Sequence, residues 1–244
     1  GAGDDTIGAS IGSDEIYGGD GNDTMSAGGF AGAGDTMDGG AGDDTITSGQ
    51  GNDTMTGGTG DDTFNVASTG GTDSITGGED GDGSDVDTLN FSDNNGTAGV
   101  SVTMTDDEDG TYSNAGETGN GTFSEIEQIN LTDQDDDFDG VLATGGNTVD
   151  GGAGDDTFAA GAGDDTIAAG DGADSISGGD GDDDIQLTDN FGDDTIVGGE
   201  GAENNGGDEI DASAVTEPVT VLFDGDEQGT ITGDNTGDHL PSPA

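Results

Sequence analysis

Apolar and polar positions alternate over very short distances in this chain, and the alternation recurs at a nearly constant spacing. An aspartate is followed two residues later by a large apolar residue, with a polar or small residue on either side of it. Since successive side chains of a strand point to opposite faces, each such pattern predicts a short strand with one inward residue. These inward residues are Ile7, Ile16, Met25, Met37, Ile46, Met55, Phe64, Ile75 and Leu89 in the first half, and Phe138, Val149, Phe158, Ile167, Ile176, Ile185, Ile196 and Ile210 in the second half.

Glycine-rich turns of about six residues connect these strands and complete a nonapeptide. Residues 18–26 read G-G-D-G-N-D-T-M-S, which has the form G-G-x-G-x-D-x-U-x, where U is a large apolar residue. Segments beginning at Gly39, Gly57, Gly151 and Gly178 have the same form, and close variants begin at Ser48, Ala160 and Ala169. A fixed period of this kind indicates stacked coils, because one inward side chain per strand needs neighbouring coils to cover it.

A larger duplication divides the chain into two arrays. Asp62, Asp73 and Asp87 are separated by steps of 11 and 14 residues, and the same steps separate Asp183, Asp194 and Asp208. Alternating apolar segments follow each array, at 100–104 and at 219–223. We therefore expect a first β-roll at 1–90, a β-rich cap at 91–131, a second β-roll at 132–211 and a truncated second cap at 212–244.

Charge determines which partners such a fold can have. The chain has no Lys or Arg, 57 acidic residues and a formal net charge of -57, while only 26% of its residues are apolar. Low hydrophobicity with high net charge is typical of disorder, so a compact state requires abundant cations. Nucleic acid and anionic membranes, which are bound through basic residues, are excluded as partners. There is no cysteine and no apolar run long enough to span a membrane. Since the chain begins within a repeat, we expect both ends to be cuts from a longer polypeptide.

The five unbroken nonapeptides resemble the RTX (repeats-in-toxin) family, whose haemolysin-type repeats form calcium-loaded parallel β-rolls. The resemblance implies an all-β fold of tandem parallel β-rolls (a β-solenoid) with a short β-rich cap between them. It also implies several bound Ca²⁺ ions, held by the aspartates at turn position six and by early-turn carbonyl groups. The expected metal-binding aspartates are Asp5, Asp14, Asp23, Asp35, Asp44, Asp53, Asp62, Asp73, Asp87, Asp136, Asp156, Asp165, Asp174, Asp183, Asp194 and Asp208. The expected turn glycines are Gly18, Gly19, Gly21, Gly39, Gly40, Gly42, Gly57, Gly58, Gly60, Gly151, Gly152, Gly154, Gly178, Gly179 and Gly181.

In the family that the chain resembles, two nonapeptides make one coil, and calcium lies between turns stacked on the same side. Hard oxygen ligands without histidine or cysteine suit Ca²⁺, which takes about 6–8 oxygens. The expected stacked pairs are Asp5 with Asp23, Asp23 with Asp44, Asp44 with Asp62, Asp14 with Asp35, Asp35 with Asp53, Asp53 with Asp73, Asp156 with Asp174, Asp165 with Asp183, and Asp174 with Asp194. Asn147 departs from the pattern. The acidic residues at position five (Asp43, Asp61, Asp155, Asp164 and Asp182) are expected to face solvent.

We do not expect an active site in this chain. It has no cysteine or lysine, and its single histidine, His239, lies in a polar tail. Three functions remain. The first is a calcium-folded structural module of a large secreted surface, adhesive or filament protein, in contact with other copies of itself. The second is the folding module of a hydrolase or toxin exported by type I secretion. The third is an ice-binding module that uses the outward threonines, which β-propensity and cross-strand packing also explain. Duplication of the whole unit favours the first.

Overall fold

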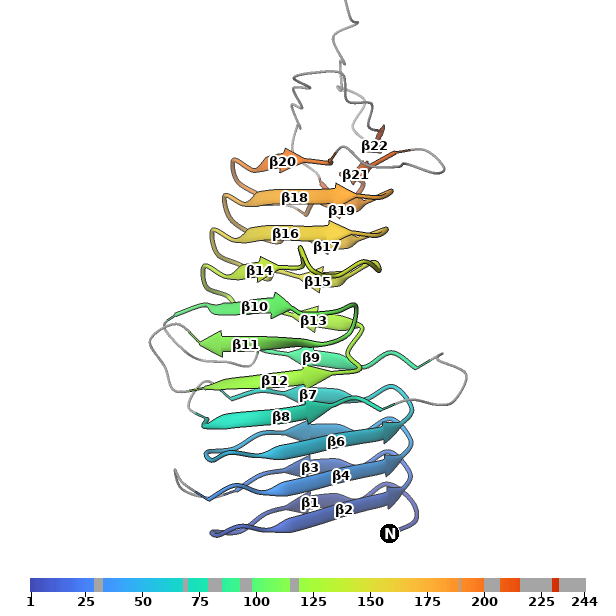
Figure 1. Ribbon diagram of the computed structural model, residues 1–244, viewed down its shortest axis with the longest axis vertical. Coiled ribbons are helices and arrows are strands. Elements are labelled where there is room, and N and C mark those ends of the chain that lie inside the picture. The colour runs from blue at the N-terminus through green and yellow to red at the C-terminus, as the bar shows by residue number, and fades with distance from the viewer. Residues whose placement is uncertain are drawn as a thin grey trace, which may run out of the picture.

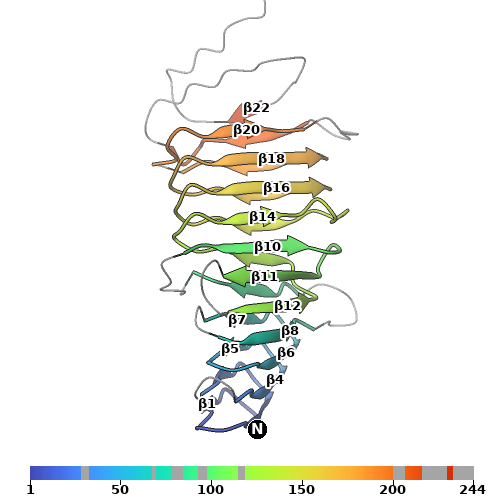
Figure 2. The ribbon, with the colours of Figure 1, turned by 60° about the vertical axis from the view of Figure 1, so that its left-hand side comes forward.

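The computed structural model describes residues 1–28, 33–67, 70–78, 85–92, 98–114, 119–188, 190–199 and 207–215, together with the backbone of 230–232. Two 11-stranded sheets face each other along an elongated stack (Figures 1 and 2). The front sheet of Figure 1 contains, in spatial order, β2 (Glu15–Asp20), β4 (Thr36–Ala41), β6 (Thr54–Thr59), β8 (Thr72–Thr76), β12 (Asn120–Ser124), β11 (Gly110–Asn114), β10 (Val100–Met104), β14 (Asp137–Asp139), β16 (Thr157–Ala162), β18 (Ser175–Asp180) and β20 (Thr195–Val197). The back sheet contains β1 (Thr6–Gly8), β3 (Thr24–Ser26), β5 (Thr45–Thr47), β7 (Thr63–Asn65), β9 (Thr88–Asn90), β13 (Gln128–Asn130), β15 (Thr148–Asp150), β17 (Thr166–Ala168), β19 (Asp184–Gln186), β21 (Glu209–Asp211) and β22 (Thr230–Thr232).

The predicted β-solenoid is confirmed. Within each array the chain alternates between the two sheets, and every strand pairs in parallel with the strand one coil away. In the described part of the chain no helix is long and apolar enough to cross a membrane. The turns that follow front strands form one side of the stack, called edge 1 here. The turns that follow back strands form the opposite side, called edge 2.

One inward column per sheet forms the core. Met25, Ile46, Phe64 and Leu89 pair directly across successive back strands, and each side chain is fully buried. In the front sheet Met37, Met55 and Ile75 form the corresponding column. Burial of such a side chain contributes about 1.5–3 kcal/mol, but only when the next coil covers it. Accordingly Ile7, Ile196 and Ile210, close to the ends of the described stack, are only partly buried.

The segment predicted as a cap lies inside the stack. Its strands β10, β11 and β12 form an antiparallel meander in the front sheet, where β12 pairs in parallel with β8 and β10 pairs in parallel with β14. In the back sheet the single strand β13 lies between β9 and β15. The meander thus places three strands in the front sheet where the back sheet has one. Both sheets therefore run without interruption from the first array into the second.

Side chains of the meander hold it to both arrays. Tyr112 is buried, and its ring meets Phe91 edge to face at a centroid distance of 5.1 Å. Asp107 lies in the turn between β10 and β11 and accepts hydrogen bonds from Thr144 N at 2.6 Å and Gly145 N at 2.8 Å. These N–H donors hold the pKa of Asp107 below its usual value. The predicted second cap lies mostly outside the described residues, as does His239; only 212–215 and β22 can be placed.

Candidate metal centre

The position-six aspartates form a ladder of hydrogen bonds along each edge. On edge 1, Asp44 N donates to Asp62 Oδ1 at 2.7 Å, while Asp44 Oδ1 accepts from Asp23 N at 2.6 Å. The same contact joins every expected stacked pair, at distances of 2.6–3.0 Å. The structure therefore brings the predicted residues together turn by turn.

Burial leaves many of these carboxylates with one oxygen that has no hydrogen bond. Asp44 and Asp62 are each 1% exposed, and within the described residues their Oδ2 atoms are buried without a donor. The same holds for Oδ2 of Asp23, Asp87, Asp156, Asp165, Asp174, Asp183 and Asp194. A buried anionic oxygen without a partner costs several kcal/mol in free energy, so such groups are normally paired or bound to a metal.

Backbone carbonyl groups and glycine Cα atoms surround these oxygens. A Cβ atom added to Gly57 would collide with the Asp62 carboxylate and lie 2.7 Å from the carbonyl oxygen of Gly77 in the next coil. Gly178 has the same relation to Asp183 and to the carbonyl oxygen of Gly198. Among the described residues no three acidic side chains meet at one point, and the oxygen beside the Asp62 and Asp183 carboxylates belongs to the backbone. A side chain on Gly57 or Gly178 would fill the space in which these oxygens converge.

Burial also changes the acidity of the ladder. It raises the pKa of Asp62 to about 7, against the hydrogen bond from Asp44 N, and the Asp44 charge adds to the rise. Burial likewise raises the pKa of Asp87 and of Asp156 to about 8. The pKa values of Asp73, Asp183 and Asp194 rise to about 6 for the same reason. Burial raises the pKa of Asp44, Asp136, Asp165, Asp174 and Asp208 as well. A nearby cation would favour the ionised form of these groups.

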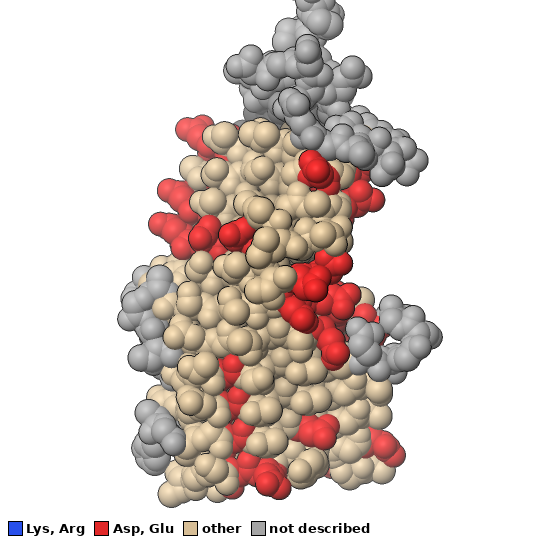
Figure 3. Space-filling model, in the orientation of Figure 1, with Lys and Arg blue, Asp and Glu red and all other residues tan. Residues whose placement is uncertain are grey.

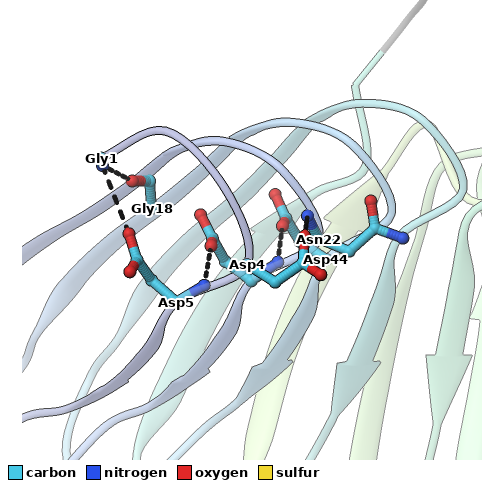
Figure 4. A network of polar contacts seen from close by, with 7 residues as sticks. Gly1, Asp4, Asp5, Gly18, Asn22 and Asp44 are labelled. Atoms are coloured by element: carbon cyan, nitrogen blue, oxygen red, sulfur yellow. Dashed lines mark hydrogen bonds and ion pairs between the residues drawn. The ribbon is translucent and has the colours of Figure 1, made fainter.

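The position-five residues form a second, outer ladder that the repeat pattern did not predict. Asp43, Asp61, Asp155 and Asp164 are exposed, and Asp182 is half-buried. Each of the exposed residues forms a hydrogen bond with a residue of a neighbouring coil; for example, Asp61 N donates to Asp43 Oδ1 at 3.2 Å. Figure 4 shows both ladders at the start of the chain, with Asp4, Asp5, Asn22 and Asp44 in stacked turns. On the face seen in Figure 3, acidic side chains lie along both sides of the upper half, and a column of them runs down the lower half.

Glu127 extends the edge 1 ladder where the first array meets the meander. Its Oε2 atom accepts from Asp87 N at 2.6 Å, in the role that an aspartate has elsewhere. The sequence did contain the signal, because Glu127 stands two residues before inward Ile129, in position-six register.

The hydrogen bonds of Asn147 indicate why this turn has an asparagine at position six in place of the usual aspartate. Its Nδ2 atom donates to the carbonyl oxygen of Ala160 at 2.9 Å and to Asp165 Oδ1 at 3.0 Å. Ala160 begins the next turn on edge 1, as Gly57 begins the turn after Asp44. In turns such as that of Asp44, a carboxylate oxygen lies beside the corresponding carbonyl oxygen. At Asn147 the side-chain amide instead donates a hydrogen bond to that carbonyl oxygen.

These groups fit Ca²⁺. The orphaned carboxylate oxygens and the converging carbonyl groups are hard oxygen ligands, which Ca²⁺ binds in sets of about 6–8 at about 2.3–2.6 Å. The residues that would hold the ions are the aspartates with buried, unpaired Oδ2 atoms, together with the carbonyl groups that begin the adjacent turns. Bound calcium would supply positive charge and coordination to these oxygens.

A parallel β-solenoid with stacked aspartate turns defines a calcium-binding repeat protein. The model of the RTX calcium-binding nonapeptide repeat, in four copies, matches residues 1–32, 31–64, 143–176, 160–187 and 186–203, which together make up just over half of the chain. The chain therefore belongs to the RTX calcium-binding repeat family, as its nonapeptides predict. No match to a curated protein was found.

Proposed function

We propose that this chain is an extracellular structural module that folds when it binds calcium and serves as a rigid part of a large secreted surface, adhesive or filament protein. The observation that carries the proposal is the column of buried carboxylate oxygens without donors, in a chain of net charge -57 without Lys or Arg. Since the ligands are scattered in the unfolded chain, the free energy of calcium binding becomes free energy of folding. The proposal assigns the module no catalytic role.

Continuity of the two sheets supports a mechanical role. Eleven strands per sheet, spaced about 4.8 Å apart, give a stack about 50 Å tall. The meander is hydrogen-bonded to both arrays, and these pairings join the described strands of the two arrays in one continuous sheet. Extracellular calcium modules bind with dissociation constants of about 10⁻⁴–10⁻³ M, which suits a module that folds only outside the cell.

Calcium removal tests the proposal. In EDTA we expect circular dichroism without a strand signal and small-angle scattering from an expanded chain with a radius of gyration of about 50 Å. Millimolar CaCl₂ is expected to produce the strand signal and a compact rod. NaCl at equal ionic strength is the control, because salt alone screens repulsion between exposed charges. A strand signal that persists in EDTA, or that NaCl restores as well as calcium does, would show that folding does not depend on calcium.

Magnesium is expected to replace calcium poorly. It requires nearly octahedral geometry at about 2.0–2.1 Å and gives up its water ligands reluctantly. Here the oxygens are fixed by stacked backbone turns, as Gly77 O is beside Asp62. Titration followed by circular dichroism should therefore need a far higher concentration of MgCl₂ than of CaCl₂ to reach the same signal. Equal midpoints for the two ions would contradict calcium-specific sites.

A further inference from the structure

The first array contains two columns of position-six aspartates, and the two columns differ at one oxygen. The Asp62 column lies on edge 1 and the Asp53 column lies on edge 2. Both Asp62 and Asp53 are 1% exposed, and in both the Oδ1 atom accepts a hydrogen bond from the preceding coil, from Asp44 N at 2.7 Å and Asp35 N at 2.8 Å. The two carboxylates therefore differ in the surroundings of Oδ2. The Asp62 column begins at the exposed Asp5 and continues with four buried residues, Asp23, Asp44, Asp62 and Asp87; the Asp53 column comprises Asp14, Asp35, Asp53 and Asp73.

Protein donors satisfy Oδ2 throughout the Asp53 column. Asp53 Oδ2 accepts from Gly49 N at 3.2 Å, and Asp73 Oδ2 accepts from the Tyr112 hydroxyl at 3.2 Å. Oδ2 of Asp14 and of Asp35 accept from Ser10 N at 3.0 Å and Gly28 N at 3.2 Å. In the Asp62 column the Oδ2 atoms of all four buried residues are themselves buried, and within the described residues none has a donor.

For Asp62 and Asp53, the backbone at the second position of the turn accounts for the difference. In the Asp62 turn this residue is Gly58, whose φ of +122° lies in the region open mainly to glycine. Its N–H points away from Asp62 and donates to the carbonyl oxygen of Gly77 in the next coil at 2.9 Å. In the Asp53 turn the equivalent residue, Gly49, does not adopt a positive φ, and its N–H donates to Asp53 within the same turn.

We propose that calcium binds the first array along edge 1 only, and that N–H and O–H donors of the protein take the place of the cation along edge 2. The inference rests on the proposed calcium-dependent function. Hydrogen bonds to the ionised form stabilise a buried carboxylate without a metal, and a cation beside Asp53 Oδ2 would face the positive end of the Gly49 N–H bond. The second array differs, because Asp156 and Asp174 on edge 2 keep unpaired Oδ2 atoms and follow Gly152 and Gly170, both with positive φ.

Matched substitutions separate the two columns. Asp62→Asn and Asp53→Asn each remove one buried charge of the same exposure and retain the shape of the side chain. Calcium counted by equilibrium dialysis of the full chain is expected to fall by at least one ion for Asp62→Asn and to stay at the wild-type number for Asp53→Asn. Loss of an ion from Asp53→Asn, or unchanged binding by Asp62→Asn, would overturn the inference.

A crystal structure of the wild-type chain grown in CaCl₂ tests the inference without a variant that could fail to fold. Anomalous difference peaks are expected beside Asp44 and Asp62 and not beside Asp35 and Asp53. Peaks in both columns would refute the one-sided assignment and leave the calcium-dependent function intact. A folded chain with no peak in either column would refute the edge 1 assignment, and the absence of peaks from the second array as well would refute calcium binding itself.

Discussion

Asp44→Ala will weaken two neighbouring calcium sites at once, whereas Asp43→Ala will leave the number of bound ions unchanged. Asp44 is linked by hydrogen bonds to Asp23 in one coil and to Asp62 in the next, and its unpaired Oδ2 lies near the carbonyl oxygen of Gly57. Its loss removes a charged ligand and leaves the buried N–H of Asp23 without its acceptor, which costs about 1–3 kcal/mol by itself. Calcium titration by calorimetry measures the ions lost.

Asp43 is the internal control, because it is the adjacent residue with the same side chain. It is exposed, and its side chain accepts hydrogen bonds from Asp61 N at 3.2 Å and Asn22 Nδ2 at 3.2 Å. Loss of exposed hydrogen bonds of this kind costs about 0.5–1.5 kcal/mol each, and water can replace them. Asp43→Ala should therefore shift the calcium midpoint slightly and the stoichiometry not at all. If both variants lost the same number of ions, the register assigned to the turns would be wrong.

Damage from Asp44→Ala should stay local. Coils of a solenoid contact only their neighbours, so the loss of one ligand spreads by nearest-neighbour coupling. Asp156, Asp165, Asp174 and Asp183 lie beyond the meander and keep their own ladder. We expect the second array to retain its calcium sites in this variant.

The repeat pattern was sufficient to predict the solenoid and its inward columns, because each short strand has a single large apolar residue and that residue must face the core. It could not predict the path of the meander. The alternation Val100, Val102, Met104 indicates a strand, but its parallel pairing with β14 and its antiparallel pairing with β11 depend on which neighbouring strands are available.

The candidate calcium sites were predictable only in part. The repeat period predicts which aspartates occupy position six. It does not predict whether the Oδ2 atom of each aspartate has a hydrogen-bond donor. Residues 48–53 and 169–174 both read small-Gly-x-Gly-x-Asp, but Gly170 has a φ of +104° and Gly49 has no positive φ. Gly170 stacks on Gly152, which also has a positive φ, whereas Gly49 stacks on Gly28, which does not. Turns of the same local sequence thus adopt different backbone conformations, so the conformation depends on tertiary surroundings that the repeat pattern does not contain.

Protons should compete with calcium over a range in which ordinary aspartates are fully ionised. In the calcium-free fold, burial raises the pKa of Asp62 to about 7 and the pKa of Asp87 and Asp156 to about 8. A raised carboxyl pKa means that the folded chain holds its protons more tightly than the unfolded chain does. This contribution to the stability of the calcium-free fold is thus fully present below the unfolded pKa of 3.8 and is lost progressively as pH rises through the folded values of about 7 and about 8.

The chain in EDTA should therefore gain strand signal in circular dichroism as pH falls from 8 toward 4, because protons neutralise the same buried carboxyl groups that calcium would bind. Calcium that binds this protonated fold must displace the protons, so its affinity for the fold should fall about tenfold per pH unit for each carboxyl group below its pKa. At pH 8 the calcium-free chain is unfolded and its aspartates are already ionised, so calcium-driven folding should release few protons there. Calorimetry in two buffers of different ionisation enthalpy should detect proton release only in the acidic range. A calcium-free chain that gains no strand signal between pH 8 and pH 4 would show that protonation of the ladder carboxyl groups does not stabilise the fold.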